Sequence, residues 1–404
     1  MRRVRVINAT LILPDRKIAG GAIDVDNGRI TALGPLHELG PSSGSTVDAA
    51  GCFVAPGFVD LHVHGGNNAD FMDGTVEAFE TAIRAHTHHG TTSIVPTSTV
   101  ARHEQTIAFL QNTRSLRRRG AQPQLGLCRV VGAHLYGPYF NEEKVGCHPK
   151  APARPPNPAE YEEYLEFADV LLTATCAPEL PGAAAFYRAA GSKGVRLNAG
   201  HSNATWTEMA AAYELGMRHV DHLYCAMSSV SSLRERCGTP MQASMLEFVL
   251  ATADMTTEVI ADGRHLSPDL LRFVAVVKGA ARTALVTDCS RALDRPPGMY
   301  TFGPLDGGEP FYSDGDVGLL PDSENLASSV RGMDFMVRHM HQQVGLDLPT
   351  AVRMASLTPA TIVGLQDEIG SLEAGKRADL LFLDADLNVM KVFLDGEAVA
   401  LHTS

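Results

Sequence analysis

The sequence lacks any uninterrupted apolar stretch of about 18 residues, the length that a membrane-spanning helix needs. Its basic first residues are not followed by an apolar segment with a cleavage site, so no signal peptide is expected. Its seven cysteines are scattered through 404 residues without one Cys-x-x-Cys pair. We therefore expect no disulfide framework and predict a cytoplasmic protein with reduced thiols.

Positive charge is also scarce, because 34 Lys and Arg stand against 46 Asp and Glu, a formal net charge of −12. Nucleic acids and anionic membranes attract basic surfaces, so neither is expected as a main partner. A small anionic substrate held by one or two local cations stays compatible with this charge. The apolar content of 45% is typical of a globular protein with a large core.

Short apolar segments alternate with helical ones along the middle of the chain. Eight strands are predicted, at 54–63, 93–97, 130–135, 171–176, 196–199, 219–223, 258–260 and 284–287. Helices are predicted among and after them, for example at 76–88, 102–119, 205–215, 268–279, 323–344 and 348–356. This alternation is typical of an α/β fold, a (β/α)8 TIM-type barrel with helices covering a parallel sheet.

Both ends of the chain consist of short strands and turns. Strands are predicted at 4–7, 10–13, 21–25, 29–34, 47–50, 380–383, 389–393 and 398–401, with a hairpin turn at 26–28. We predict one small β-sandwich domain from residues 1–53 and 358–404, and a barrel domain from residues 54–357. The proline-rich loop 141–158 after the third barrel strand is a candidate lid.

The first predicted barrel strand ends in His-x-His, at His62 and His64. Residues two apart in a strand point to the same face, so both imidazoles leave the strand side by side and are suited to hold a metal ion. Active sites of such barrels lie at the carboxyl ends of the strands. Further polar residues stand at or just after later strand ends, namely His134, Tyr136, His201, His222, His265 and Asp288. The set predicts a metal site.

Six motifs of the chain resemble those of one family. They are VDLHVH at 59–64, HLYGP at 134–138, GHS at 200–202, HLYCAM at 222–227, IADGRH at 260–265 and VTD at 286–288. With them the chain resembles the N-acetylglucosamine-6-phosphate deacetylases of the amidohydrolase superfamily. The tail segments SLTPA at 356–360 and GSLEAGKRADL at 370–380 are similar to the C-terminal signature of that superfamily. The resemblance extends over nearly the whole chain.

The resemblance implies a metal-dependent hydrolase that removes the acetyl group of N-acetylglucosamine 6-phosphate or a related N-acetylamino-sugar phosphate. The products are the amino-sugar phosphate and acetate. It implies a divalent metal, with zinc as the expected ion, and a homodimer. It also implies that Asp288 is the general base, that His201 and His222 hold the metal that polarises the carbonyl, and that His62 and His64 hold a second metal with Asp288.

Substrate contacts are implied in the same way. The residues expected to contact the sugar or its phosphate are His148, Cys225, Ala226 and His265. The family grips the phosphate with an arginine supplied across the dimer interface, and either Arg234 or Arg236 matches that position. A guanidinium suits the two-pronged recognition of phosphate.

Two positions depart from the family pattern. Tyr136 replaces a metal-binding Glu, and Cys225 replaces a substrate-binding Asn. Three arrangements follow: one metal on His201, His222 and water; one metal on His62, His64 and Asp288 with His201 added; or coordination by Tyr136 as a phenolate. A single ion is favoured, because a phenol is a poor ligand at its ordinary pKa.

These departures leave two alternative functions open. One is a divergent amidohydrolase or deaminase acting on another amide or on an aminated substrate. The other is a non-catalytic relative that binds a sugar phosphate. Retention of Asp288 favours an enzyme, since a protein that only binds sugar has no use for a water-activating base.

Overall fold

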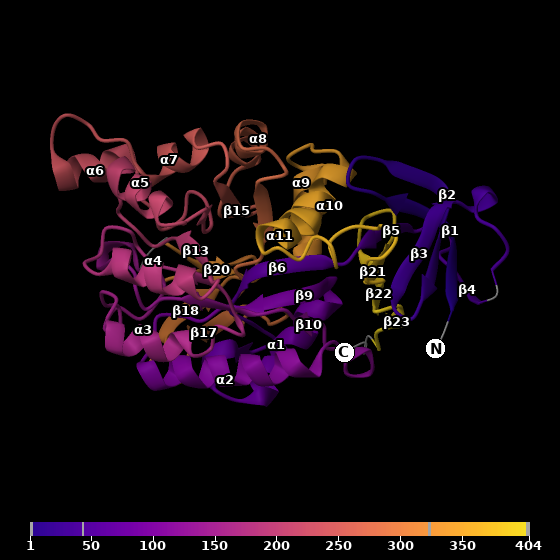
Figure 1. Cartoon of the computed structure of the whole chain (residues 1–404), viewed down its shortest axis with the longest axis horizontal. Helices are drawn as coiled ribbons and strands as arrows, with labels where there is room; N and C mark the ends of the chain where they lie inside the picture. Colours follow the sequence, from indigo (N-terminus) through magenta and orange to yellow (C-terminus); the bar gives the residue numbers. More distant parts are fainter. Residues whose placement is uncertain (1–2, 43, 322–324, 401–404) are drawn as a thin grey trace.

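The barrel strands form in the expected order in a computed structural model that describes residues 3–42, 44–321 and 325–400 (Figure 1). The strands are β6 (Phe58–Val63), β9 (Thr91–Pro96), β10 (Arg129–Val130) with β11 (Ala133–Tyr136), β12 (Leu171–Thr175), β13 (Arg196–Ala199), β14 (His219–Val220), β15 (Thr256–Ile260) and β16 (Thr283–Val286). They pair in parallel as β6-β9-β10 and from β11 through β16. The predicted α/β barrel is confirmed.

Two contacts complete the circle of strands. A bridge between Thr97 and His134 joins the β9 side to β11. At the other seam, Thr287 donates its hydroxyl to Asp60 at 2.6 Å, and the Asp288 backbone N–H donates to the carbonyl of His62 at 2.8 Å. These bonds bring the ends of β16 and β6 together, so the predicted general base lies beside the predicted metal-binding strand.

Helices cover the outside of the barrel (Figure 1). They are α1 (Val76–His88), α2 (His103–Arg119), α3 (Pro158–Leu165), α4 (Ala183–Ser192), α5 (Trp206–Glu214), α6 (Val230–Cys237), α7 (Met245–Ala251), α8 (Pro268–Val277), α9 (Met333–Gln342), α10 (Leu348–Ala355) and α11 (Leu357–Ile362). Side chains cap many of them at the start, as Thr75 does for α1 and Thr205 with Glu208 for α5. Among the described residues, none of the helices has the length and apolarity to cross a membrane.

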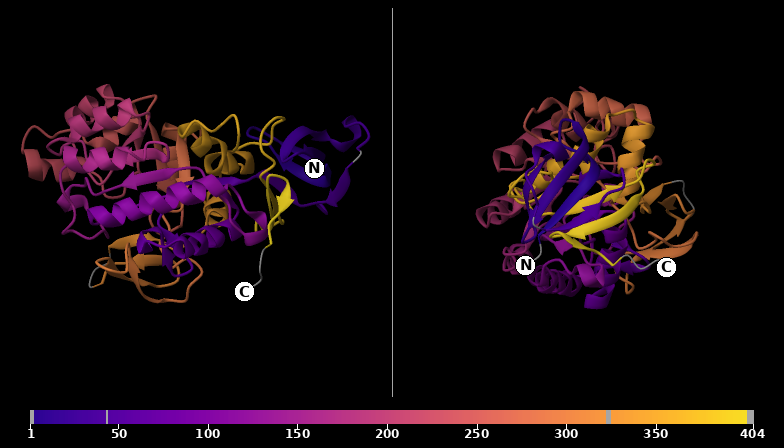
Figure 2. Two further views of the ribbon diagram at one scale, coloured as in Figure 1. Left: turned by 60° about the horizontal axis from the view of Figure 1, so that its bottom comes forward. Right: turned by 90° about the vertical axis from the view of Figure 1, so that its right-hand side faces the viewer.

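The prediction of a helix over 323–344 is wrong in its first third. Residues 323 and 324 lie outside the described part, Leu326–Ser329 forms strand β20, and α9 begins only at Met333. Antiparallel pairing with β19 (Val317–Leu319) stabilises the strand, and this non-local partner is invisible to local propensity. β20 closes a four-stranded sheet with β17 (Gly298–Phe302) and β18 (Glu309–Ser313), the orange sheet at the bottom of the left view in Figure 2.

Both ends of the chain meet in one small β domain, as predicted; its strands all belong to one sheet, and the indigo and yellow strands lie side by side in the right view of Figure 2. Its strands are β1 (Val4–Ile12), β2 (Lys17–Asp26), β3 (Arg29–Pro35), β4 (Ser45–Asp48), β5 (Phe53–Pro56), β21 (Leu380–Leu383), β22 (Val389–Leu394) and β23 (Glu397–Ala398). β5 pairs with β1 and with β21, so it belongs to this sheet rather than to the barrel. The last predicted strand, 398–401, overlaps β23 by one residue, and its end lies outside the described residues.

The predicted strand 54–63 is therefore two strands, β5 and β6, which meet at Gly57. A Cβ on Gly57 would lie 2.0 Å from the Thr92 hydroxyl oxygen, so only glycine fits where the chain passes from one sheet to the other. The two sheets have separate apolar cores, that of the small sheet being built on residues such as Leu11, Ile23, Val54 and Phe382. The division into domains at 53 and 357 stays a prediction.

Candidate active site

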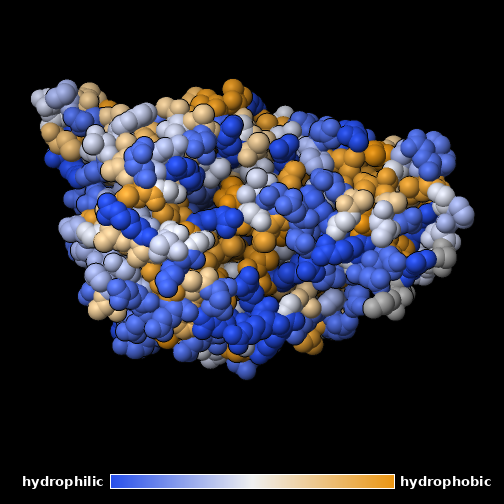
Figure 3. All heavy atoms as spheres, viewed as in Figure 1, coloured by the Kyte–Doolittle hydropathy of each residue, from blue (hydrophilic) through white to orange (hydrophobic). Residues whose placement is uncertain are grey.

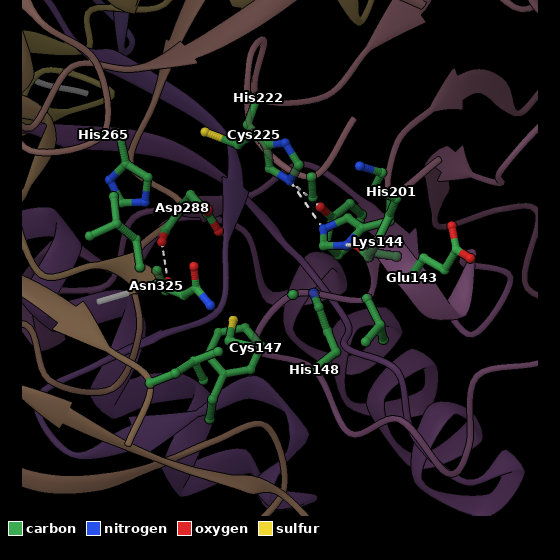
Figure 4. Close-up of a pocket in the computed structure, with 18 of the residues that line it drawn as sticks. Glu143, Lys144, Cys147, His148, His201, His222, Cys225, His265, Asp288 and Asn325 are labelled. Carbon is green, nitrogen blue, oxygen red and sulfur yellow. Dashed lines mark hydrogen bonds between the residues drawn. The ribbon is translucent and has the colours of Figure 1, made fainter. Parts of the chain in front are cut away.

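Four of the side chains predicted at strand ends, those of His201, His222, His265 and Asp288, gather at one mouth of the barrel (Figure 4). A cavity of about 540 Å³ opens there, large enough for a sugar phosphate. Its lining includes Tyr136, His148, His201, His222, Cys225, Ala226, His265 and Asp288. His62 and His64 lie beneath them and are buried. The structure thus brings together every residue predicted to bind metal. His134, another of the side chains predicted at strand ends, does not line the cavity, and its Nε2 lies 2.7 Å from the hydroxyl of Thr175.

One group of three residues fits a divalent cation. The Nε2 atoms of His62 and His64 lie 3.7 and 3.2 Å from Oδ1 of Asp288, and one possible ligand atom of each residue lies within 4.8 Å of the other two. Neither Nε2 has a hydrogen-bond partner among the described residues. Buried polar atoms are rarely left unpaired, and imidazole nitrogens with a carboxylate are ordinary zinc ligands. These residues therefore suit the metal that the motifs imply.

His201, His222 and Tyr136 form a second group on the pocket side of the first. The two Nε2 atoms of the histidines face each other at 3.2 Å, and the Tyr136 hydroxyl contacts Nε2 of His222 (Figure 4). Nδ1 of His201 donates to the carbonyl oxygen of Lys144 at 2.6 Å, which leaves its Nε2 as a lone-pair donor.

Burial sets the charge of this second group. It lowers the pKa of His201 well below the usual value and that of His222 to about 4, so both rings are neutral. Burial also raises the pKa of the Tyr136 phenol well above its ordinary value. Tyr136 is thus a neutral hydroxyl that can donate a hydrogen bond, and it does not offer the negative charge of the Glu it replaces.

Left-handed backbone turns aim these side chains into the mouth. The φ angles are 45° at His201, 21° at His222 and 44° at Asp288, and Ala226 has 46°. Such conformations cost roughly 1–3 kcal/mol each in residues other than glycine and concentrate at functional sites. The strain here falls where barrel strands β13, β14 and β16 give way to loops.

Asp288 is an ionised carboxylate. Burial alone would raise the pKa of its carboxyl, but the field of His62 and the contact with His64 hold it well below the usual range. Asp288 is therefore unprotonated at neutral pH.

Two further histidines face the cavity. Nδ1 of His148 accepts the Val100 backbone N–H at 3.2 Å, and burial keeps the pKa of His148 well below its usual value. His148 is therefore neutral, with its remaining proton on Nε2. His265 lies 2.7 Å from Asp262 through Nδ1; burial lowers the pKa of His265, but Asp262 outweighs it and raises that pKa overall. The pKa values of these two histidines are thus shifted in opposite directions within one pocket.

The two arginines considered for phosphate lie outside the cavity. Arg236, in α6, forms a two-pronged ion pair with Glu208, with Nη2 2.7 Å from Oε1, and also donates to the carbonyl of Asn203. Arg234 is exposed and makes no ion pair with any residue that the structure describes. Among the described residues, the lysines that line the cavity are Lys144 and Lys150, both in the predicted lid loop.

Sequence reasoning missed Glu258, a carboxylate 1% exposed in the middle of β15. Its Oε1 lies 2.5 Å from Nδ1 of His62. The signal was present, because a charged residue inside the apolar run T-T-E-V-I cannot be buried without a partner. Phe302 of β17 was missed as well, since it reaches the cavity from a sheet that the sequence did not predict.

Comparison with known proteins indicates the same family as the sequence motifs. The amidohydrolase family model matches residues 53–399, so the chain belongs to the amidohydrolase family and is a hydrolase. The resemblance drawn from the motifs is confirmed. Members of this superfamily depend on metal, which agrees with the donor set of His62, His64 and Asp288.

Among individual relatives, the chain is 30% identical over 374 residues to an N-acetylgalactosamine-6-phosphate deacetylase of Escherichia coli O157:H7, covering 92% of this chain and 93% of that one. It is also 30% identical over 376 residues to an N-acetylglucosamine-6-phosphate deacetylase of Vibrio furnissii, covering 93% and 89%. The crystal structure of the N-acetylglucosamine-6-phosphate deacetylase from Pasteurella multocida superposes with a TM-score of 0.89 at 27% identity, over 99% of this chain and 100% of that one.

Proposed function

We propose that this protein is a metal-dependent deacetylase that hydrolyses the acetamide of N-acetylglucosamine 6-phosphate, or of its galacto epimer, to the amino-sugar phosphate and acetate. The observation that carries the proposal is an ionised Asp288 beside two unpartnered imidazole nitrogens at the floor of a sugar-sized cavity. Relatives of both sugar specificities are equally similar to the chain, so both epimers are candidate substrates.

Asp288 does the proton chemistry in this proposal. Its carboxylate takes a proton from a water molecule, whose oxygen attacks the acetyl carbonyl carbon. The same proton then passes from Asp288 to the amide nitrogen as the carbon–nitrogen bond breaks. A bound divalent ion supplies Lewis-acid polarisation of the carbonyl and makes the water more acidic.

The walls of the cavity suit a phosphorylated sugar. His148 offers one neutral Nε2–H donor to a sugar oxygen, and Lys144 and Lys150 in the lining favour an anionic group. Cys225 and Ala226 line the same cavity from the strained turn after β14. Cys225 is a weaker hydrogen-bond donor than an Asn, which predicts looser recognition of the sugar at this point.

We infer one zinc ion per chain, held by His62, His64 and Asp288. The Tyr136 hydroxyl contacts Nε2 of His222. Tyr136 therefore serves as a neutral hydrogen-bonding partner of His222 in the second group. The phenolate alternative is disfavoured, because burial opposes ionisation of that phenol.

Substitution of Tyr136 tests the inferred metal count. Tyr136→Glu returns a carboxylate to the second group and is expected to raise the zinc content from one to two ions per chain. Tyr136→Phe, the control, keeps the ring without the hydroxyl and should stay at one. Elemental analysis of the purified proteins measures both. One ion per chain in Tyr136→Glu would contradict this account of the metal centre.

A homodimer is part of the proposal. Arg234 projects from α6 without an ion pair among the described residues, and an apolar patch with exposed Phe273, Val276 and Val277 lies over α8, near the upper edge of Figure 3. A second copy packed on this face would cover the patch and could receive Arg234 as a phosphate ligand.

Light scattering tests the proposed dimer and should give twice the chain mass. Arg234→Ala should raise KM for the phosphorylated sugar, while KM for unphosphorylated sugar stays the same. A monomer that is fully active would contradict it.

A product panel tests the proposed reaction. Acetate and ammonia are measured separately with N-acetylglucosamine 6-phosphate, its galacto epimer and an aminated ring as substrates. Acetate from one or both phosphosugars is expected, whereas ammonia alone would favour the deaminase alternative.

The proposed location of the reaction is the cytoplasm. All seven cysteines are unpaired, which supports this location.

A further inference from the structure

Glu258 lies behind the predicted metal centre, on the side away from the cavity. Its Oε1 is 2.5 Å from Nδ1 of His62 and accepts the backbone N–H of His222 at 3.2 Å. Its Oε2 is 3.3 Å from Nε2 of His219, whose Nδ1 is in turn 2.8 Å from the hydroxyl of Thr256. One carboxylate therefore contacts the side chain of one predicted metal ligand and the backbone of another.

The contact with His62 determines which nitrogen of that ring is available. A carboxylate on Nδ1 keeps a proton there, so Nε2, 3.7 Å from Asp288, is the ring nitrogen left for a metal ion. Nε2 has no hydrogen-bond partner among the described residues. Metal-binding histidines in proteins commonly have such a carboxylate on the opposite nitrogen, where it holds the ring and raises its basicity.

The charge of the centre also involves Glu258. His62, His64 and Asp288 together offer one carboxylate, and position 136 is a neutral phenol. A divalent ion on that set would leave an uncompensated positive charge in a buried place, which is costly. Glu258 is 1% exposed and supplies a second negative charge one imidazole ring away.

We propose that Glu258 is a positioning residue of the metal centre, which orients His62 through Nδ1 and balances the charge of a divalent ion in a site without a carboxylate at position 136. The inference rests on the metal dependence in the proposed function, and it is independent of the identity of the substrate.

Zinc affinity measures this role directly. The full-length protein is stripped with a chelator and titrated with zinc against a chromophoric competitor, with no substrate present. Glu258→Gln is expected to weaken zinc binding by about 10- to 100-fold, the usual effect of losing such a partner. Asp70→Asn is the matched control, because Asp70 is equally buried and its carboxylate accepts the backbone N–H groups of Met72 and Gly303 rather than contacting a predicted metal ligand. It should bind zinc within about threefold of the parent.

A double-variant cycle separates positioning from a general structural effect. In a His62→Gln background, Glu258 no longer has an imidazole to orient, so adding Glu258→Gln should change zinc affinity by less than about threefold. An undiminished effect in that background would overturn the proposal, as would parental affinity in folded Glu258→Gln. If Glu258→Gln does not fold, Glu258→Asp keeps the charge but withdraws it from His62, and unchanged affinity there would overturn the proposal equally. A protein that binds zinc as expected but releases no acetate would refute the proposed substrate and leave this inference intact.

Discussion

At the scale of single residues, the central feature is a carboxylate kept ionised inside the protein. Asp288 is 9% exposed, and its negative charge survives burial because His62 and His64 stand beside it. The strained backbone at Asp288 and His222 aims both side chains at the same space. Function here depends on side chains held in unfavourable conformations by a rigid barrel.

Removal of the charge at position 288 is the sharpest test at this scale. Asp288→Asn cannot accept the proton of water, so kcat for acetate release should fall by about 10³-fold. Asp306→Asn removes a carboxylate that is 88% exposed on the surface and should leave kcat unchanged. Steady-state kinetics of both variants measure kcat for acetate release. An Asp288→Asn protein with more than a tenth of the parental kcat would show that another group is the base.

Strand-end residues could be predicted because the rules that place them are local. Alternation along a strand puts His62 and His64 on one face, and the barrel architecture puts strand ends at one mouth. Glu258 could not be predicted in the same way. Its partners His62 and His219 come from other strands, and only the closed barrel brings them to its carboxylate.

At the scale of elements, His89 joins the end of α1 to the start of α9. Its two ring nitrogens lie 3.0 Å from Asp294 and 2.9 Å from Asp334 in the first turn of α9. Burial lowers the pKa of His89, but these two carboxylates outweigh it and raise that pKa to about 10. Because the ordinary pKa of histidine is about 6.5, the folded protein holds this proton more tightly than the unfolded chain.

The pairing of His89 with two carboxylates predicts that the stability of the protein depends on pH. Its contribution is complete below about pH 6.5 and is lost as the pH rises toward 10, since only the folded state favours the proton. The parent should therefore lose about 2 kcal/mol of unfolding free energy over this window, the size of charge-assisted hydrogen bonds. His89→Gln should lose much less over the same window. Urea denaturation at pH 6.5 and 9.5 measures both, and equal losses in the two proteins would refute the role of His89.

The helices and strands themselves were largely predictable, with one instructive exception. The helix 76–88 and the strand 380–383 were predicted to the residue, because each has a clear apolar period and a clear boundary. The sheet from β17 to β20 was not predicted, and part of it was taken for helix. Its strands are only three to five residues long, too short to show a clear apolar period.

At the scale of the whole molecule, Arg129 fastens the barrel to the small sheet. Its guanidinium, on β10, lies 2.8 Å from Asp379 and 2.7 Å from Asp395, which flank β21 and β22. Arg129 and Asp379 have side-chain exposures of 12% and 5%, so solvent screens the pair weakly. The C-terminal strands of the small sheet are thus held against a barrel strand by a nearly dry ion pair.

Breaking this attachment should be costly. Arg129→Met leaves Asp379 buried without its partner and is expected to lower the unfolding free energy by about 3–5 kcal/mol. Arg29→Met breaks an exposed pair with Glu368 and should cost about 1 kcal/mol or less. Denaturant titration compares the two. Equal, small effects would mean that the Arg129 pair does not hold the two sheets together.

The whole account depends on a metal ion at the mouth of the barrel that enables Asp288 to hydrolyse an acetamide. The most direct measurement is acetate release from N-acetylglucosamine 6-phosphate and its galacto epimer before chelation, after chelation and after zinc is returned. The account predicts acetate release that disappears with the metal and recovers with about one zinc per chain. Undiminished release from metal-free protein, or no acetate from either sugar with zinc bound, would contradict it.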